Sequence, residues 1–297
     1  MFIDQKKCKI CSAEGEVVTN LKFENQEIIN FFTSVYNKQI SNFLKKKIGK
    51  KRFILKKCSH CQFIWQSNTP KNLFLKQLYD KIIDPKESFK KSKKTSSETI
   101  KNYQREITFI QNFHDKKNLN ILDFGAGWGT WLLAIKKQCP NIFALELSSS
   151  RRKFLKNKKI KLVNLNNTSN YKSFFHVIKL EQVLEHVANL DRVILNLKKI
   201  LVKGGILSIG VPNGKKEINK NIITIKKGPI QPLEHLNCFN NKSLKLCLKK
   251  NGFRPISLFE IIITFVKMKK YSYQNIYFVL RTIKNSIFTT RIHFVKK

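Results

Sequence analysis

Residues 121–135 read ILDFGAGWGTWLLAI, a short apolar strand followed at once by a glycine-rich loop and the beginning of a helix. The glycines alternate at Gly125, Gly127 and Gly129, and apolar residues at helical spacing come directly after them. Glycines at this spacing permit a tight turn and let a ligand approach the backbone closely. The helix that follows presents free N–H groups and a partial positive charge. We therefore expect a nucleotide-like ligand at the carboxyl edge of a parallel sheet, the alternative being a tight turn that binds nothing.

The acidic residue that precedes this loop restricts the class of ligand that the loop can bind. A dinucleotide-binding loop has the spacing G-x-G-x-x-G, whereas this chain has G-x-G-x-G with Asp123 two residues before the first glycine. A carboxylate is poorly suited to a pyrophosphate and well suited to a ligand with a cationic amino-acid end. The stretch resembles motif I of the class I S-adenosylmethionine-dependent methyltransferases.

The order of the predicted elements indicates an α/β fold. Strands alternate with helices after the glycine loop, so the crossovers should be right-handed and the sheet mostly parallel. Glu146 ends the second strand, 17 positions after Gly129, where an acid can accept hydrogen bonds from both ribose hydroxyls of a nucleoside. We predict further strands at 160–164, 174–180, 206–211, 253–263 and 291–295, the last antiparallel to its neighbour, and helices at 148–157, 187–201 and 271–287.

Three later stretches strengthen the resemblance: EQVLEHV at 181–187, LKKILVKGGILSIGVPN at 197–213 and LEHLNCFNNKSLKLCLKKNGF at 233–253. Together they extend it over residues 95–297 and predict a Rossmann-like methyltransferase domain. Asn166 and Asn167 are the nearest polar candidates for the adenine-contacting position. The resemblance implies S-adenosylmethionine as the cofactor, bound by Asp123, Gly125, Ala126, Gly127, Gly129, Glu146, Leu147 and Glu181.

Two cysteine pairs of equal spacing lie near the N-terminus. Cys8 and Cys11 form one C-x-x-C pair, and Cys58 and Cys61 form the other. Four thiolates so arranged can complete a tetrahedral Zn²⁺ site, so we predict structural zinc; thiols without metal, or disulfides, are the alternatives. The whole chain also resembles bacterial methyltransferases with such an N-terminal module, a group associated with sugar and surface-polysaccharide modification.

The composition places the domain boundaries. We predict a zinc-ribbon-like module over residues 1–83, ending in a helix at 72–83. A Lys- and Ser-rich linker follows at 84–97, and the methyltransferase domain occupies 98–297 and opens with an amphipathic helix.

The net charge of +39, from 58 basic and 19 acidic residues, would suit a polyanionic partner. However, eight of the basic residues are Arg and 50 are Lys, and Lys, Asn, Ile and Phe are all abundant, as an AT-rich genome would produce through its codons. Nucleic acid therefore stays possible but less favoured. No apolar run is long enough to span a bilayer and the N-terminus lacks a signal core, so we expect a cytoplasmic protein.

The expected reaction is transfer of a sulfonium methyl group to a small-molecule acceptor by in-line displacement. We favour a hydroxyl of a sugar or glycan precursor, with His235 and His186 as candidate bases and a basic lid at 215–231. The apolar, basic segment 271–287 either packs on the sheet or contacts an anionic membrane surface. An RNA methyltransferase, and a non-catalytic scaffold with a vestigial pocket, are the competing interpretations.

Overall fold

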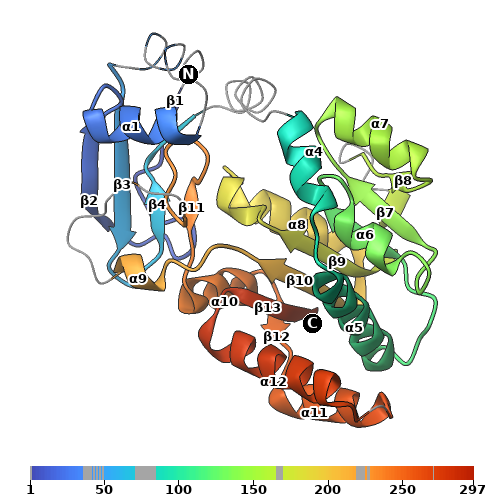
Figure 1. Ribbon diagram of the computed structural model, residues 1–297. Helices are drawn as coiled ribbons and strands as arrows, with labels where there is room; N and C mark the ends of the chain where they lie inside the picture. The colour runs from blue at the N-terminus through green and yellow to red at the C-terminus, as the bar shows by residue number, and fades with distance from the viewer. Residues whose placement is uncertain are drawn as a thin grey trace. The chain divides into compact units, whose positions relative to one another are not determined.

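The computed structural model describes residues 2–35, 42, 44, 46, 48, 50–70, 85–164, 170–218, 225, 228–269 and 271–297. The chain folds into two compact units, each assembled from three chain segments. The first unit comprises Met1–Asp84, Leu184–Leu190 and Val211–Cys247, and the second comprises Pro85–Val183, Asp191–Gly210 and Leu248–Lys297. Figure 1 shows the elements of both.

The second unit is built on a seven-stranded sheet in the order β12-β13-β10-β9-β6-β7-β8. The five strands from β10 to β8 are parallel, and β13 is antiparallel to both of its neighbours. This confirms the predicted Rossmann-like sheet with an antiparallel last strand. The strands are β6 (Ile121–Phe124), β7 (Ile142–Leu145), β8 (Lys161–Leu162), β9 (Phe175–Glu181), β10 (Leu201–Gly210), β12 (Phe253–Pro255) and β13 (Arg291–Lys296).

Helices pack on this sheet through one continuous apolar core. The core joins Ile107 and Ile110 of α5, Leu132 of α6, Ile261 of α11 and Phe278 of α12 to residues of β6 and β7. Each fully buried side chain of this size contributes roughly 1.5–3 kcal/mol, so the core accounts for much of the stability. The helices are α4 (Pro85–Lys93), α5 (Ser97–Phe113), α6 (Thr130–Ile135), α7 (Ser149–Asn157), α8 (Leu190–Ile200), α11 (Leu258–Lys267) and α12 (Tyr273–Phe288).

One predicted strand is wrong beyond its first residues. The strand expected at 253–263 ends at Pro255, and α11 begins at Leu258. A capping box explains the switch: the Glu260 N–H donates to Ser257 Oγ over 3.2 Å, and the Ser257 N–H donates to the Glu260 carboxylate over 2.9 Å. The Arg254 guanidinium hydrogen-bonds to Glu260 and holds the pKa of that carboxyl at about 2. Local capping therefore outweighs the β-propensity of the following isoleucines.

The segment expected to be a linker contains helix α4, which packs on the glycine-loop region. The Phe89 ring lies 4.8 Å from the Trp128 ring and 5.2 Å from the Phe154 ring, measured between centroids. Ser88 Oγ accepts a hydrogen bond from Trp128 Nε1 over 3.0 Å. The predicted helix at 72–83, like Asn166 and Asn167, lies outside the described residues.

The first unit holds a four-stranded antiparallel sheet in the order β11-β4-β3-β2. Its edge strand β11 comes from the LEHLNCF stretch, far along the chain from the other three. The compact units therefore do not coincide with the predicted domain boundaries at residues 83 and 98. Those domain boundaries stay a prediction. The unit's elements are β1 (Phe2–Asp4), β2 (Gly15–Lys22), α1 (Gln26–Val35), β3 (Arg52–Cys58), β4 (Ile64–Gln66), β5 (Asn68–Pro70), the 3-10 turn η2 (Leu184–His186), α9 (Lys215–Ile218), β11 (Asn237–Cys238) and most of α10 (Asn241–Lys250).

Candidate functional site

The glycine loop between β6 and α6 is shaped by left-handed backbone. Gly125, Gly127 and Gly129 have φ values of 85°, 55° and 70°. A Cβ at Gly125 would lie 2.7 Å from Val183, and one at Gly129 would lie 2.5 Å from Leu155, so these two glycines are required by packing. A Cβ at Gly127 would meet nothing within 4 Å. Gly127 is therefore the loop position where open space adjoins the backbone and a ligand can approach.

Glu146, directly after β7, ties the loop to the end of the neighbouring strand. Its Oε2 accepts a hydrogen bond from the Gly127 N–H over 2.8 Å, and its Oε1 accepts from the Leu147 and Ser148 N–H groups over 2.8 and 2.9 Å. Arg151 Nη1 lies 3.8 Å from the same carboxylate. A carboxylate oxygen has two lone pairs, so Oε2 keeps capacity for a ligand hydroxyl beside Gly127. Leu147 is exposed next to it.

Asp123 is buried on β6, two residues before the loop. Burial raises the pKa of its carboxyl from 3.8 to about 7, with Lys179 opposing the shift and the carboxylates of Glu181, Glu146 and Glu106 adding to it. A cationic group placed beside Asp123 would favour its charged form. The position therefore suits a ligand that brings its own positive charge.

Glu181, at the end of β9, is held by an ion pair. Arg291 of β13 donates to both of its carboxylate oxygens, with Nη1 at 2.9 Å from Oε2 and Nη2 at 2.5 Å from Oε1. A Cβ on Gly210 of β10 would lie 2.5 Å from Glu181 Oε2, so the missing side chain makes room for this carboxylate. Glu181 lies at the same carboxyl edge of the sheet as Asp123 and Glu146, and each of its carboxylate oxygens contacts Arg291.

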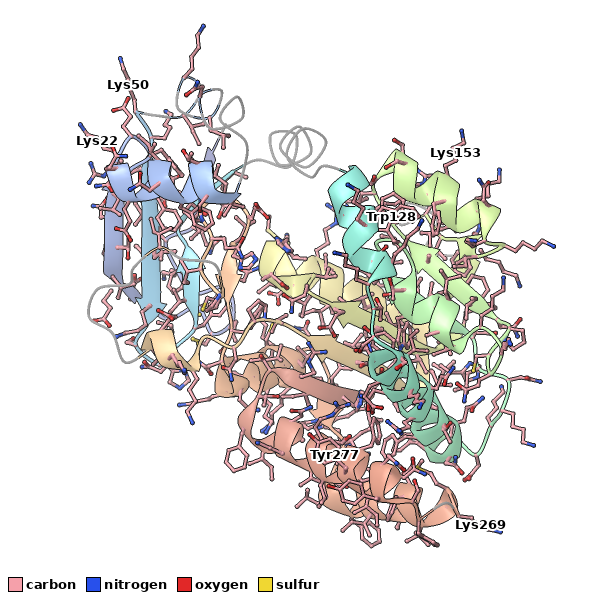
Figure 2. All side chains as sticks on the ribbon, viewed as in Figure 1. Lys22, Lys50, Trp128, Lys153, Lys269 and Tyr277 are labelled. Atoms are coloured by element: carbon pink, nitrogen blue, oxygen red, sulfur yellow. The ribbon has the colours of Figure 1, made fainter. Side chains whose placement is uncertain are left out.

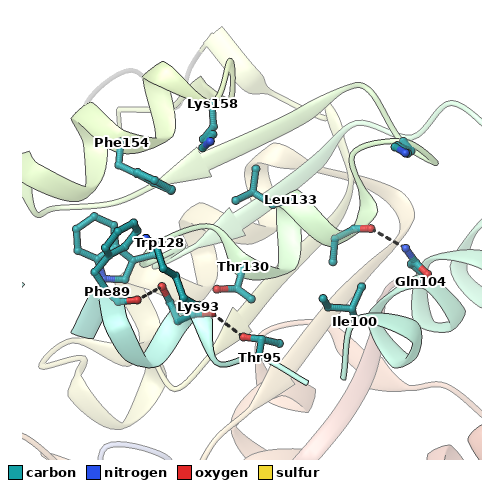
Figure 3. A pocket seen from close by; sticks show the side chains of 13 residues that line it. Phe89, Lys93, Thr95, Ile100, Gln104, Trp128, Thr130, Leu133, Phe154 and Lys158 are labelled. Carbon is teal, nitrogen blue, oxygen red and sulfur yellow. Dashed lines mark hydrogen bonds between the residues drawn. The ribbon is translucent and has the colours of Figure 1, made fainter. Parts of the chain in front are cut away.

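A hollow of about 610 Å³ lies between helices α4, α5, α6 and α7. Phe89, Trp128, Thr130, Gln104 and Lys158 are among its lining residues, and Figure 3 shows them around the start of α6. None of the residues predicted to bind the cofactor lines it. We therefore place the cofactor candidates by the backbone geometry at Gly127 and the carboxylates of Asp123 and Glu146, and not by this hollow.

The four N-terminal cysteines converge in the first unit. The Cys8 and Cys61 sulfurs lie 3.6 Å apart, Cys11 and Cys58 3.4 Å, and Cys11 and Cys61 3.8 Å. The two C-x-x-C turns have the same local structure, because Ser12 and Gln62, each following a second cysteine, both take positive φ values of 61° and 59°. Backbone N–H groups also point at sulfur, from Ile10 to Cys8 and from Cys61 to Cys58, each over 3.4 Å. The group could hold a metal ion.

The candidate bases His186 and His235 also meet in the first unit, beside Glu185. Their ring centroids lie 4.9 Å apart, and His186 Nε2 lies 4.0 Å from Glu185 Oε1. His186 Nδ1 lies 2.9 Å from the Glu234 carbonyl, which can only accept, so Nδ1 carries the proton and Nε2 is the acceptor nitrogen of a neutral ring. Burial, followed by the neighbouring His186, lowers the pKa of His235 to about 3.

Comparison with known proteins identifies the family of the chain. Residues 96–258, more than half of the sequence, match a family described as a methyltransferase domain. The chain belongs to this family. It is an S-adenosylmethionine-dependent methyltransferase, with a four-cysteine cluster near its N-terminus. No curated protein matches the sequence.

Several solved structures are similar to the chain at low identity. The [4+2]-cyclase SpnF is 14% identical over 65% of this chain and 80% of its own, with a TM-score of 0.42. A methyltransferase from Aquifex aeolicus is 14% identical over 59% of this chain and 91% of its own, with a TM-score of 0.42. A methyltransferase from Archaeoglobus fulgidus is 17% identical over 65% of this chain and 94% of its own, with a TM-score of 0.37.

The residues around the glycine loop fit the cofactor of the family. The open space at Gly127 admits a ligand to the backbone, and Glu146 Oε2 has acceptor capacity beside it. Buried Asp123 favours a positively charged neighbour. Gly127, Glu146 and Asp123 of this methyltransferase would hold S-adenosylmethionine, and Glu181, which is ion-paired with Arg291, stays a predicted cofactor contact.

A buried polar network in the described part of this methyltransferase was not predicted from the sequence. Lys179 of β9 donates to Glu106 of α5 over 2.6 Å, and Ser208 of β10 donates to the same carboxylate over 3.1 Å. Burial alone would raise the pKa of Glu106, yet Lys179 beside it makes the net shift a lowering. A lysine inside the apolar strand FFHVIKL was the available signal, because a buried lysine requires an acidic partner.

Proposed function

We propose that this methyltransferase acts on a hydroxyl of a sugar or glycan precursor. The observation that carries the proposal is the Glu185–His186–His235 group, because a hydroxyl is a poor nucleophile until a neighbouring base accepts its proton. The four-cysteine unit supports it as well, since the chain resembles sugar-modifying methyltransferases with such a module. His186 follows Glu181, at the end of β9, by only five residues of chain.

Bound S-adenosylmethionine supplies an electrophilic methyl group, and charge is neutralised as that group is transferred. The chain's own contribution is alignment of the acceptor and removal of its proton. His186 is the first candidate for the base, because its tautomer leaves Nε2 with a lone pair and its side chain is partly exposed. Burial lowers the pKa of His186, which keeps the ring neutral near pH 7. His235, whose ring contacts the His186 ring and whose pKa burial lowers to about 3, would position His186.

We further propose that the four cysteines bind structural zinc. Four sulfurs at about 2.3 Å from one Zn²⁺ in a tetrahedron lie roughly 3.8 Å from one another. The sulfur separations of 3.4, 3.6 and 3.8 Å are close to this value. Hydrogen bonds from backbone N–H groups to Cys8 and Cys58 would stabilise thiolate charge. In this proposal zinc organises the first unit and takes no part in methyl transfer.

The test incubates the full chain with methyl-labelled S-adenosylmethionine and a cell extract. Label is then measured in the soluble, lipid and nucleic-acid fractions. We expect label in a sugar-containing soluble or lipid fraction. His186→Ala should lower turnover about 100-fold while cofactor affinity is kept, and His235→Ala should lower it less. His60→Ala, at an exposed histidine of the same unit, is the matched control. Label in RNA, or unchanged turnover in both cluster variants, would overturn the proposal.

A further inference from the structure

Helix α11 has two apolar faces, of which only one is buried. Ile261, Thr264 and Met268 point into the core of the second unit. The other face is exposed although it is equally apolar, and its residues recur at helical spacing: Leu258, Phe259, Ile262, Ile263 and Val266. A helix of a globular protein normally presents polar residues on the face that meets water. We therefore expect a binding partner to cover this face of α11.

Helix α12 repeats the pattern. Phe278 and Val279 are buried against the sheet side, whereas Tyr273, Ile276, Tyr277 and Leu280 are exposed on the outer side, followed by Ile287 and Phe288. α11 packs against α12, and the Phe265 ring lies 5.5 Å from the Tyr271 ring in the turn between them. Figure 1 shows the two helices as an antiparallel pair, and Figure 2 shows Lys269 extending outward at their turn.

The exposed apolar residues are concentrated on this helix pair. Of the 16 large hydrophobic residues that are exposed in the described part of the chain, 12 lie between Leu258 and Phe288. Isolated exposed hydrophobics are ordinary, but a contiguous set of this size marks an interaction surface. We call these twelve residues the α11–α12 face: Leu258, Phe259, Ile262, Ile263, Val266, Tyr271, Tyr273, Ile276, Tyr277, Leu280, Ile287 and Phe288.

The positive charge around the α11–α12 face favours an anionic partner. The 37 residues after Glu260 contain eight basic residues and no acidic one. Lys269 and Lys284 are exposed beside the apolar stripes. A second copy of the chain would bring another strongly basic surface to this face, which disfavours self-association. An apolar stripe with tyrosines and flanking lysines matches the interface of a bilayer that contains anionic lipid.

The helices are too short to cross a membrane. At 1.5 Å per residue, the 10 residues of α11 and the 16 of α12 extend about 15 and 24 Å, against a hydrocarbon core of roughly 30 Å. Among the described residues no helix combines the length and hydrophobicity that a membrane span requires. The helix pair would therefore lie on a bilayer surface.

We propose that the α11–α12 face docks the methyltransferase on membranes that contain anionic lipid. The apolar stripes enter the boundary between headgroups and acyl chains, and the lysines pair with lipid phosphates. This inference stands independently of the acceptor proposed above, because it uses neither the histidines nor the cysteines. It predicts that the enzyme works at a membrane surface without spanning it.

The test is flotation of the full chain with vesicles at about 0.1 M salt, where surface charges are partly screened. One set of vesicles is phosphatidylcholine alone, and the other is an equal mixture of phosphatidylcholine and phosphatidylglycerol. We expect binding to the anionic vesicles. Phe259→Gln combined with Leu280→Gln should weaken it at least ~10-fold, because both side chains are exposed and insert into the bilayer. Leu195→Gln, at an exposed leucine of α8, is the matched apolar control.

Charge is tested by a second matched pair. Lys269→Glu with Lys284→Glu should abolish binding to the anionic vesicles, whereas Lys153→Glu with Lys156→Glu on α7 changes the net charge equally and should bind like the wild type. Cofactor binding shows that each variant is folded. Absence of vesicle binding by the folded wild type, or equal losses in both charge variants, would overturn the proposal. Concentration-dependent dimerisation that only the apolar variant abolishes, without vesicle binding, would also overturn it.

Discussion

The cysteine cluster and the glycine loop hold their shapes by different means. The loop is made of neighbouring residues, and its conformation follows from three left-handed glycines and from backbone bonds such as those of Gly125 and Ala126 to the Leu145 carbonyl, over 2.8 and 3.1 Å. The cluster joins cysteines up to 53 positions apart, in a unit whose longest described strand has eight residues. The loop should therefore be preformed, whereas the cluster should depend on its metal.

The largest effect expected from this comparison follows loss of the metal. Cys58→Ser, or chelation of the wild type, should remove about one zinc per chain. A structural zinc site contributes folding energy outright, so amide protection should collapse in the described residues 2–35 and 50–70. Hydrogen exchange measures this, and cofactor binding by the second unit should persist. Cys139→Ser, at a buried cysteine outside the cluster, is the control and should retain the metal. If the metal-free Cys58→Ser protein kept full amide protection, the cluster would not depend on its metal, and the contrast with the loop would be wrong.

The next largest effect concerns the second unit, whose stability should depend on its sheet and on the buried Lys179–Glu106 pair. Lys179→Met leaves the buried Glu106 carboxylate without its ion-pair partner. This substitution should lower the free energy of unfolding by about 3–5 kcal/mol. Lys179→Met combined with Glu106→Gln should recover much of this loss. Lys250→Met, which breaks the more exposed pair with Asp191, should cost at most about 1 kcal/mol. Denaturant unfolding with equal losses in the two single variants would contradict the role assigned to the network.

A third effect, which depends on pH, should appear at Asp123, where the site itself reduces stability. The folded pKa of about 7 lies above the usual 3.8, so the folded state keeps a proton that the unfolded chain releases. The free energy of unfolding of the wild type should therefore fall as the pH rises from about 4 to 7, by up to about 4 kcal/mol. Asp123→Asn should lack this fall. It should match the wild type near pH 4 and exceed it at pH 8. Parallel pH profiles for the two proteins would show that Asp123 is not titrating in this range.

The sequence predicted what is local. The β6–loop–α6 unit, the position of Glu146 and the two cysteine pairs all follow from spacing over a few residues. The capping signature Ser257-x-x-Glu260 was also present, and it would have predicted α11 where the isoleucines suggested a strand.

What the sequence did not reveal depends on contacts between distant segments. The pairing of Asn237–Cys238 with β4 places His235 in the first unit, and no local pattern indicates it. The burial that lowers the pKa of His235, and the contact of Lys179 with Glu106, likewise arise only when separate elements pack together. Periodicity reports which face of an element is apolar, but not which other element covers it.

Calorimetry of S-adenosylmethionine binding tests the central claim, that the glycine loop and Glu146 form the cofactor site, most directly. The folded wild type should bind, and Gly127→Val and Glu146→Ala should each weaken binding strongly. Gly204→Val is the matched control for the first variant, because Gly204 also has a positive φ, of 72°, and nothing within 4 Å of an added Cβ. It should bind like the wild type. Absence of binding by the folded wild type, or equal weakening in Gly127→Val and Gly204→Val, would contradict this assignment.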